Sequence, residues 1–112
     1  MTESFLESIV KNNQHEVAAA RRKKPQTARM KKICQNRPGR ALIRSLSRPG
    51  RVNIVAEIKR ASPSKGILCE SLDAGGTAHT YEKCGAAAIS VLTDRRFFKG
   101  GPDDLRQAKA VT

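Results

Sequence analysis

The chain is poor in aromatic residues and in long apolar runs. Its 112 residues include no Trp, one Tyr and three Phe, and 38% of them are apolar. This composition predicts a thin, mainly aliphatic core, still within the range of globular domains. No stretch approaches the roughly 20 apolar residues that span a bilayer, and "MTESFLESIV" carries acids where a signal peptide carries basic residues. We therefore expect a cytoplasmic protein with no membrane partner.

Cysteine and histidine are also scarce. Cys34, Cys69 and Cys84 have no C-x-x-C spacing, and His15 and His79 form no ligand pattern with them. Metal and redox sites in proteins usually show such spacings. We expect free thiols in a reducing compartment and no metal site.

Acidic residues are few in the first half of the chain. Residues 1–51 hold 13 Lys/Arg against 3 Asp/Glu, whereas residues 52–112 hold 9 against 7, and the net charge is +12. Clustered basic residues favour phosphate polyanions, so one hypothesis is a nucleic-acid-binding module built on residues 1–51. Residues 11–51 contain no Phe, Tyr or Trp on which a base could stack. We therefore expect weak, salt-sensitive adhesion rather than specific nucleic-acid binding.

The basic half has helical patterns. Ser4 and Glu7 have the spacing of a capping box, and the helix that they begin should end before Pro25. "TARMKKICQN" predicts a second helix, ended by Pro38-Gly39, and "RALIRSLSRPG" predicts a short amphipathic turn or helix. We interpret residues 1–51 as a basic helical N-terminal extension.

The pattern changes after Gly50. "VNIVAEI" (52–58) and "AAAISVL" (86–92) are nearly continuous apolar runs, typical of strands buried on both faces. A helix over 73–85 should join them, with Asp73 as its cap and with Ala78 and Tyr81 facing the core.

The remaining segments complete a regular alternation. "RASPSKG" (60–66) and "TDRRFFKGG" (93–101) are expected to be loops, and a further helix should begin near Pro102. Strand, helix, strand and helix in this order imply parallel strands with right-handed crossovers.

Two parallel strands alone leave both sheet edges open. A complete α/β barrel needs about 250 residues. We therefore interpret residues 52–112 as the first two βα units of an incomplete α/β barrel, prone to self-association in isolation.

Glu57 and Lys59 are the candidate catalytic residues. Side chains at i and i+2 of a strand share a face, and these two lie at the carboxyl end of the first strand, where ligands of α/β proteins gather. The pair offers a carboxylate for proton handling and a cation for an anionic substrate. A structural salt bridge at a strand end is the alternative, and residue types alone leave it open.

Two long motifs carry a family resemblance. "IVAEIKRASPSKG" and, some twenty residues later, "YEKCGAAAISVLTDRRFFKGGPDDL" resemble the first two strands of the indole-3-glycerol-phosphate synthase family. The resemblance is close over 52–105 and looser over 1–51. It implies a (β/α)8 TIM barrel that converts 1-(o-carboxyphenylamino)-1-deoxyribulose 5-phosphate to indole-3-glycerol phosphate, losing carbon dioxide and water without a cofactor.

The resemblance also implies roles for individual residues. Glu57 matches a glutamate that assists dehydration or polarises the intermediate, and Lys59 matches a lysine that holds the anionic groups of the substrate and steers ring closure. Ser62 matches a residue that lines the substrate site, and Leu92 and Phe98 match apolar positions around the anthranilate ring. For Ser62 the alternative is an ordinary turn, and for the Phe pair it is a plug that anchors the loop.

Several functional groups of that family have no counterpart in these 112 residues. Its general-acid lysine lies on strand three, its general-base glutamate on strand four, and its phosphate-binding groups on strands seven and eight. We therefore expect this chain alone to be inactive and to need the remainder of the barrel as its partner. Another phosphate-sugar barrel is a further alternative, against which the E-x-K followed by S-P-S argues.

Overall fold

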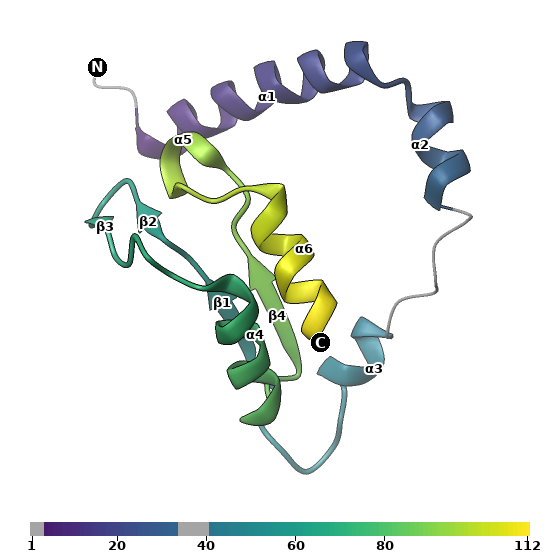
Figure 1. Cartoon of the computed structure of the whole chain (residues 1–112), viewed down its shortest axis with the longest axis vertical. Coiled ribbons are helices and arrows are strands. Elements are labelled where there is room, and N and C mark those ends of the chain that lie inside the picture. Colours follow the sequence, from purple (N-terminus) through teal and green to yellow (C-terminus); the bar gives the residue numbers. More distant parts are fainter. Residues whose placement is uncertain (1–3, 34–40) are drawn as a thin grey trace. The chain divides into compact units, whose positions relative to one another are not determined.

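The computed structural model describes residues 4–33 and 41–112, and the chain divides into two compact units, 1–40 and 41–112. The first contains helices α1 (Phe5–Lys23) and α2 (Gln26–Ile33), drawn in Figure 1. The second contains the other helices and the four strands of the described residues.

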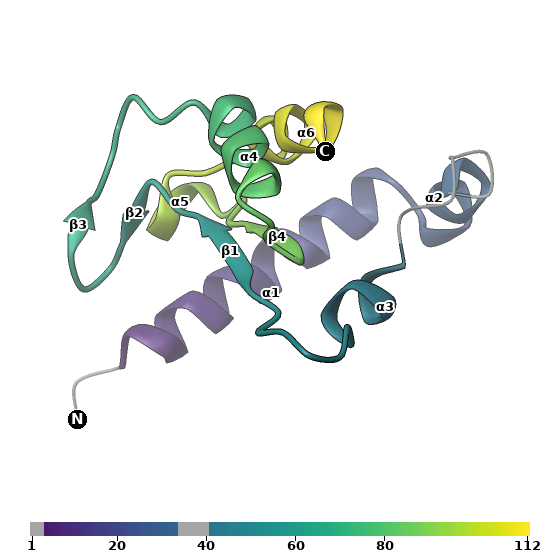
Figure 2. The same cartoon turned by 90° about the horizontal axis from the view of Figure 1, so that it is seen from below.

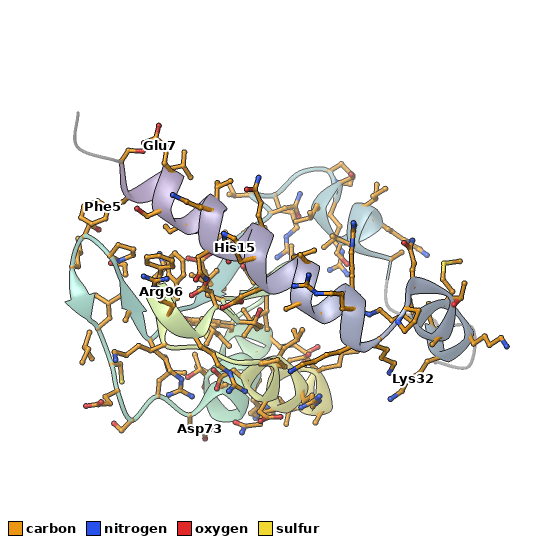
Figure 3. The ribbon with its side chains drawn as sticks, turned by 90° about the horizontal axis from the view of Figure 1, so that it is seen from above. Phe5, Glu7, His15, Lys32, Asp73 and Arg96 are labelled. Atoms are coloured by element: carbon orange, nitrogen blue, oxygen red, sulfur yellow. The ribbon has the colours of Figure 1, made fainter. Side chains whose placement is uncertain are left out.

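Helix α1 begins with the predicted capping box. The Ser4 amide donates to Glu7 Oε2 at 2.8 Å, and the Glu7 amide donates to Ser4 Oγ at 3.2 Å. Figure 3 shows Glu7 at this first turn. The helix ends at Lys23, before Pro25, as expected.

A side chain of α2 caps the other end of α1. Arg29 donates from Nη2 to the Ala20 carbonyl at 2.8 Å and from Nε to the Lys24 carbonyl at 3.1 Å. The Ala20 carbonyl also accepts from the Lys24 amide at 3.1 Å, and Lys24 is the residue that follows the helix, so Arg29 adds side-chain donors at the end of α1. The predicted second helix is confirmed as far as Ile33; Cys34 and the Pro38-Gly39 stop lie outside the described residues.

The second unit is a β–α–β–α arrangement preceded by a short helix. Its main elements are α3 (Leu42–Leu46), β1 (Val55–Ile58), α4 (Ala74–Lys83), β4 (Ala88–Val91) and α6 (Pro102–Val111). Strands β1 and β4 pair in parallel, with Val55 opposite Ala88 and Ile58 opposite Val91. The predicted alternation and parallel pairing are confirmed. Helix α3 contacts β4, so it belongs to this unit.

Helices α4 and α6 lie on the same side of the sheet, as Figure 2 shows, and pack against each other. The buried cluster beneath them consists of Ile58, Ala74, Ala78 and Ala108. Alanine at three of these positions lets helices and sheet approach closely. Tyr81 packs against this cluster, so the inward face predicted for this helix is confirmed.

The expectation that both strands are buried on both faces is wrong. Ile58 is buried, but Val55 is 53% exposed, and β4 is half-buried along its length. The two helices cover only one face of the sheet. Strand β1 also begins at Val55 rather than residue 52, and Ile54 is exposed. A continuous apolar run therefore did not indicate two-sided burial.

Both expected loops contain short regular elements. Residues 60–66 include most of an antiparallel hairpin, β2 (Ala61–Ser62) with β3 (Gly66–Ile67), in which Gly66 has a φ of 68°. Residues 93–101 contain a one-turn helix, α5 (Arg95–Phe98). The hairpin and the one-turn helix depend on local side-chain contacts and turn geometry, and not on a periodic pattern of apolar residues.

No helix within 4–33 or 41–112 combines the length and the apolar character needed to cross a membrane.

Candidate active site

Glu57 and Lys59 form an ion pair at the carboxyl end of β1. Lys59 Nζ lies 3.0 Å from Glu57 Oε1, and the side chains are 35% and 41% exposed, respectively. The residue between them, Ile58, is buried beneath the helices. Because side chains alternate along a strand, the charged pair lies on the face of the sheet opposite α4 and α6.

Strand β4 adds a polar group that the sequence analysis did not single out. Ser90 is the register partner of Glu57, and its Oγ donates to Glu57 Oε2 at 3.4 Å. The available signal was a serine within the otherwise apolar "AAAISVL" (86–92). Glu57 therefore has a cation on one oxygen and a hydroxyl near the other.

Ser62 lies in the hairpin beyond β1, where its hydroxyl serves a turn. Its Oγ accepts from the Lys65 amide at 3.2 Å and lies 3.5 Å from Ser64 Oγ. This contact is what the ordinary-turn alternative predicts. The hairpin nevertheless reaches other candidate residues, because β2 contacts α5, the helix that ends at Phe98.

Leu92 follows β4 and continues its pairing with β1. Its amide donates to the Ile58 carbonyl at 3.1 Å, and alternation puts its half-buried side chain on the same face as Ser90. The structure thus places Glu57 and Lys59 in contact and puts Leu92 on their face of the sheet.

The loop after β4 is held by its own hydrogen bonds. Asp94 Oδ1 accepts from the Phe97 amide at 2.7 Å and caps α5, and the Gly100 amide donates to the Asp94 carbonyl at 3.0 Å. Phe97 and Phe98 are both half-buried. The Arg96 guanidinium lies over the Phe97 ring, 5.3 Å from its centroid.

A second ion pair, on the helix side of the sheet, was also missed. Arg60 Nη2 donates to Asp104 Oδ1 at 2.6 Å and Arg60 Nε donates to Asp104 Oδ2 at 3.3 Å, with side chains 19% and 12% exposed. The hydrogen bond from Arg60 lowers the pKa of the Asp104 carboxyl, against the opposing effect of burial. The two residues are 44 positions apart, so no local pattern links them.

The described residues contain no cluster of His, Cys, Asp and Glu that could hold a metal ion. Cys69 and Cys84 are exposed free thiols. Cys34 lies outside the described part of the chain.

Parallel strands joined by a helix, with charged and polar side chains gathered at their carboxyl ends, define an α/β protein built from consecutive βα units. Residues 6–112 match the family model described as indole-3-glycerol phosphate synthase, and the chain belongs to this family. The resemblance drawn from the two motifs is confirmed. The family has a TIM-barrel fold and carries out a lyase reaction.

Similar curated proteins carry the same description. The chain is 44% identical over 109 residues to the indole-3-glycerol phosphate synthase of Syntrophobacter fumaroxidans, an alignment covering 96% of this chain and 41% of that protein. It is 42% identical over 114 residues to that of Carboxydothermus hydrogenoformans, covering 96% and 43%. It is 48% identical over 79 residues to that of Desulforamulus reducens, covering 70% and 30%. The chain thus spans about two fifths of the length of the relatives that it matches most fully.

Proposed function

We propose that this chain is the N-terminal portion of an indole-3-glycerol-phosphate synthase. In the assembled enzyme it contributes the first two βα units of a (β/α)8 barrel, residues 52–112, and the helical extension 1–51. The reaction converts 1-(o-carboxyphenylamino)-1-deoxyribulose 5-phosphate to indole-3-glycerol phosphate, with loss of one carbon dioxide and one water. The overall conversion needs no redox cofactor, because the substrate gains and loses no electrons when carbon dioxide and water leave.

The observation that carries the proposal is the placement of the Glu57–Lys59 pair. The two head groups are 3.0 Å apart on the sheet face opposite the helices. In a (β/α)8 barrel that face is the interior, and active sites lie at the carboxyl ends of the strands. The family match supports reading this pair as part of an active site rather than as a surface bridge.

Each candidate residue then has a chemical role. Lys59 supplies a positive charge for the anionic groups of the substrate and steers ring closure. Glu57 assists removal of the hydroxyl that leaves as water, or polarises the intermediate that carries it. A hydroxyl is a poor leaving group, and proton transfer by a positioned side chain is the usual remedy.

Three further residues would line the substrate site. Ser62 would line it from the hairpin, and Leu92 and Phe98 would supply apolar contacts to the anthranilate ring. Contact between β2 and α5 supports this grouping, because it brings the elements of Ser62 and Phe98 together.

We expect the 112-residue chain to be inactive alone. The family's strand-three lysine and strand-four glutamate have no counterpart in its sequence. The family match argues against the other phosphate-sugar barrels. Nothing in the described residues favours the nucleic-acid module over a solvated basic extension.

The test is to supply the remainder of the barrel. Residues 1–112 are joined to the segment of the Syntrophobacter fumaroxidans relative that follows the matched region, and product is followed by its indole fluorescence. We expect turnover from the joined protein and none from either part alone. A joined protein that is folded by circular dichroism but forms no product would contradict the proposal.

A further inference from the structure

Arg60 joins three parts of the second unit. It follows Lys59 directly, yet its side chain reaches the helix side of the sheet, where it pairs with Asp104 near the start of α6. Its Nη1 also donates to the Glu70 carbonyl at 3.1 Å. One guanidinium therefore connects the end of β1, the beginning of α6 and the segment after the hairpin.

The backbone of Arg60 closes the base of that hairpin. Its carbonyl accepts from the Leu68 amide at 2.8 Å and from the Cys69 amide at 3.1 Å. The hairpin of residues 61–67, which includes Ser62, therefore begins and ends at the Arg60 backbone. The adjoining peptide carries Lys59, so a rotation of the chain at Arg60 would move both the lysine and the hairpin.

Asp104 is itself held in place. Its Oδ2 accepts from the Gly101 amide at 3.1 Å, which closes the first turn of α6. Hydrogen bonding to Arg60 lowers the pKa of Asp104, so the carboxylate stays charged. A bidentate guanidinium–carboxylate contact fixes orientation as well as distance, which a lysine at position 60 could not reproduce.

We propose that Arg60 is a positioning residue for the candidate active site, and that Asp104 anchors it. The pair fixes the direction in which the chain leaves β1, and so holds the Lys59 amino group beside Glu57 and keeps the hairpin 61–67 at the same end of the sheet. The inference rests on the proposed function, since it assigns this role toward the substrate site. The simpler alternative is an ion pair that only stabilises the fold.

The chain offers a matched control on the same helix. Asp103 pairs with Arg106, and both side chains are largely exposed, at 73% and 75%. Arg106→Lys makes the same chemical change as Arg60→Lys, but in a largely exposed pair within α6. Asp104→Asn is a second test variant, which keeps the shape of the side chain.

The first measurement uses the 112-residue chain itself. In Arg60→Lys we expect the amides of Leu68 and Cys69 to exchange at least tenfold faster with solvent. We also expect the carboxyl carbon resonance of Glu57 to move toward its position in Lys59→Met, because the charged pair has opened. Arg106→Lys should change neither. If Arg60→Lys leaves both readouts at their wild-type values, the positioning role is wrong.

The second measurement uses the joined barrel, with kcat and KM expressed per folded molecule. We expect Arg60→Lys and Asp104→Asn to lower kcat/KM at least tenfold and Arg106→Lys to leave it unchanged. If these two variants lower the melting temperature but leave kcat and KM unchanged, the Arg60–Asp104 pair only stabilises the fold and the positioning role is wrong. If the wild-type joined barrel makes no product, the proposed function fails, and the exchange and resonance measurements still decide whether Arg60 positions Lys59.

Discussion

The side chains of Glu57 and Lys59 are only partly withdrawn from water, at 41% and 35% exposure. Ion pairs that accessible contribute about 0–1 kcal/mol to stability, because solvent screens the attraction and two side chains lose freedom. Two roles for this pair therefore predict different results. A structural bridge would affect stability alone, and an active-site pair would affect turnover far more than stability.

Lys59→Met and Glu57→Gln separate these roles. We expect each to change the free energy of unfolding of the chain by less than about 1 kcal/mol. In the joined barrel we expect kcat to fall about 10²-fold to 10⁴-fold for Glu57→Gln, the range that a positioned acid or base contributes. Urea unfolding and indole fluorescence measure the two effects.

Ser90→Ala is the control for this experiment. It removes the hydroxyl near Glu57 but leaves the carboxylate and its cation, so activity should fall less than with Glu57→Gln. Activity retained in both the Glu57 and the Lys59 variants would show that the pair is a structural bridge.

Gly100 occupies a position where only glycine fits. A Cβ there would lie 1.9 Å from the Leu92 carbonyl oxygen and 2.9 Å from its carbon, and backbone atoms cannot give way as a flexible side chain can. We expect Gly100→Ala to destabilise the second unit by about 1–3 kcal/mol, the usual cost of overpacking. At the neighbouring Gly101 a Cβ would meet nothing nearer than Arg95 Nε at 3.9 Å. Gly101→Ala should therefore cost clearly less, and equal losses in chemical unfolding would refute the steric explanation.

At the scale of elements, the sequence patterns located the long helices and both main strands. Ser4 with Glu7, and the break at Pro25, correctly bounded α1 because caps and prolines act within one turn. The hairpin 61–67 and helix α5 were missed because each is too short to show a period. The Arg60–Asp104 contact could not be foreseen, since only the packing of α6 against the sheet brings residues 44 positions apart together.

The candidate site was only partly accessible to the same reasoning. The i and i+2 spacing placed Glu57 beside Lys59, because a strand fixes which face a side chain takes. The contact of Ser90 with Glu57 depends on the register between β1 and β4, and the alternation of side chains within one strand does not determine that register. The prediction that both strands are buried on both faces was wrong. A run of apolar residues shows which side chains favour burial, but it does not show which elements cover them.

The capping box gives a prediction for α1 alone. Ser4→Ala removes the acceptor of the Glu7 amide and should destabilise this helix by about 1 kcal/mol. Ser8→Ala lies within the helix and should stabilise it slightly, because alanine is the better helix former. Amide exchange along the first turns of α1 measures both. Faster exchange in Ser8→Ala than in Ser4→Ala would contradict the capping role.

The link between β1 and α6 makes the stability of the second unit depend on pH. Hydrogen bonding and charge attraction from Arg60 hold the pKa of Asp104 below its ordinary value of 3.8. The unfolded state then binds more protons than the folded state around that pH, so stability falls as pH falls. Asp104 contributes fully above pH 3.8, and its contribution is lost as pH decreases through the lower, folded value.

Urea unfolding from pH 7 down to pH 2 tests this linkage. At pH 7 we expect Asp104→Asn to lower the free energy of unfolding by about 1–3 kcal/mol, the cost of leaving a charged hydrogen-bonding group of a partly buried pair without its partner. The difference between wild type and variant should shrink below pH 4. Arg60 also faces Asp73 and Cys69, so Asp73→Asn is run in parallel to separate its charge from that of Asp104. A difference that stays constant with pH would argue against the ion pair as the source.

At the scale of the whole molecule, the second unit presents a two-stranded parallel sheet with only one face covered by α4 and α6. Parallel sheets in known proteins are covered on both faces. In the described structure Val55 of β1 is 53% exposed, and both strands of this two-stranded sheet are edges. An exposed apolar edge is a template for pairing with another chain. The same surface would be the interior of the barrel in the proposed enzyme.

We therefore expect the isolated chain to self-associate through this sheet. Val55→Lys puts a charge on the exposed face and edge of β1, and should shift the chain toward monomer in sedimentation velocity at a given concentration. Phe5→Lys is the matched control, because Phe5 is a comparably exposed apolar residue on α1 in the other unit. If Phe5→Lys disperses the assemblies and Val55→Lys does not, the exposed apolar residues of α1, which include Phe5 and Leu6, form the associating surface. A wild-type chain that is monomeric and melts in one sharp transition would contradict association altogether.

Because the joined barrel would cover the sheet, it should be monomeric at concentrations where the chain alone is not. This difference would tie the association to the open sheet.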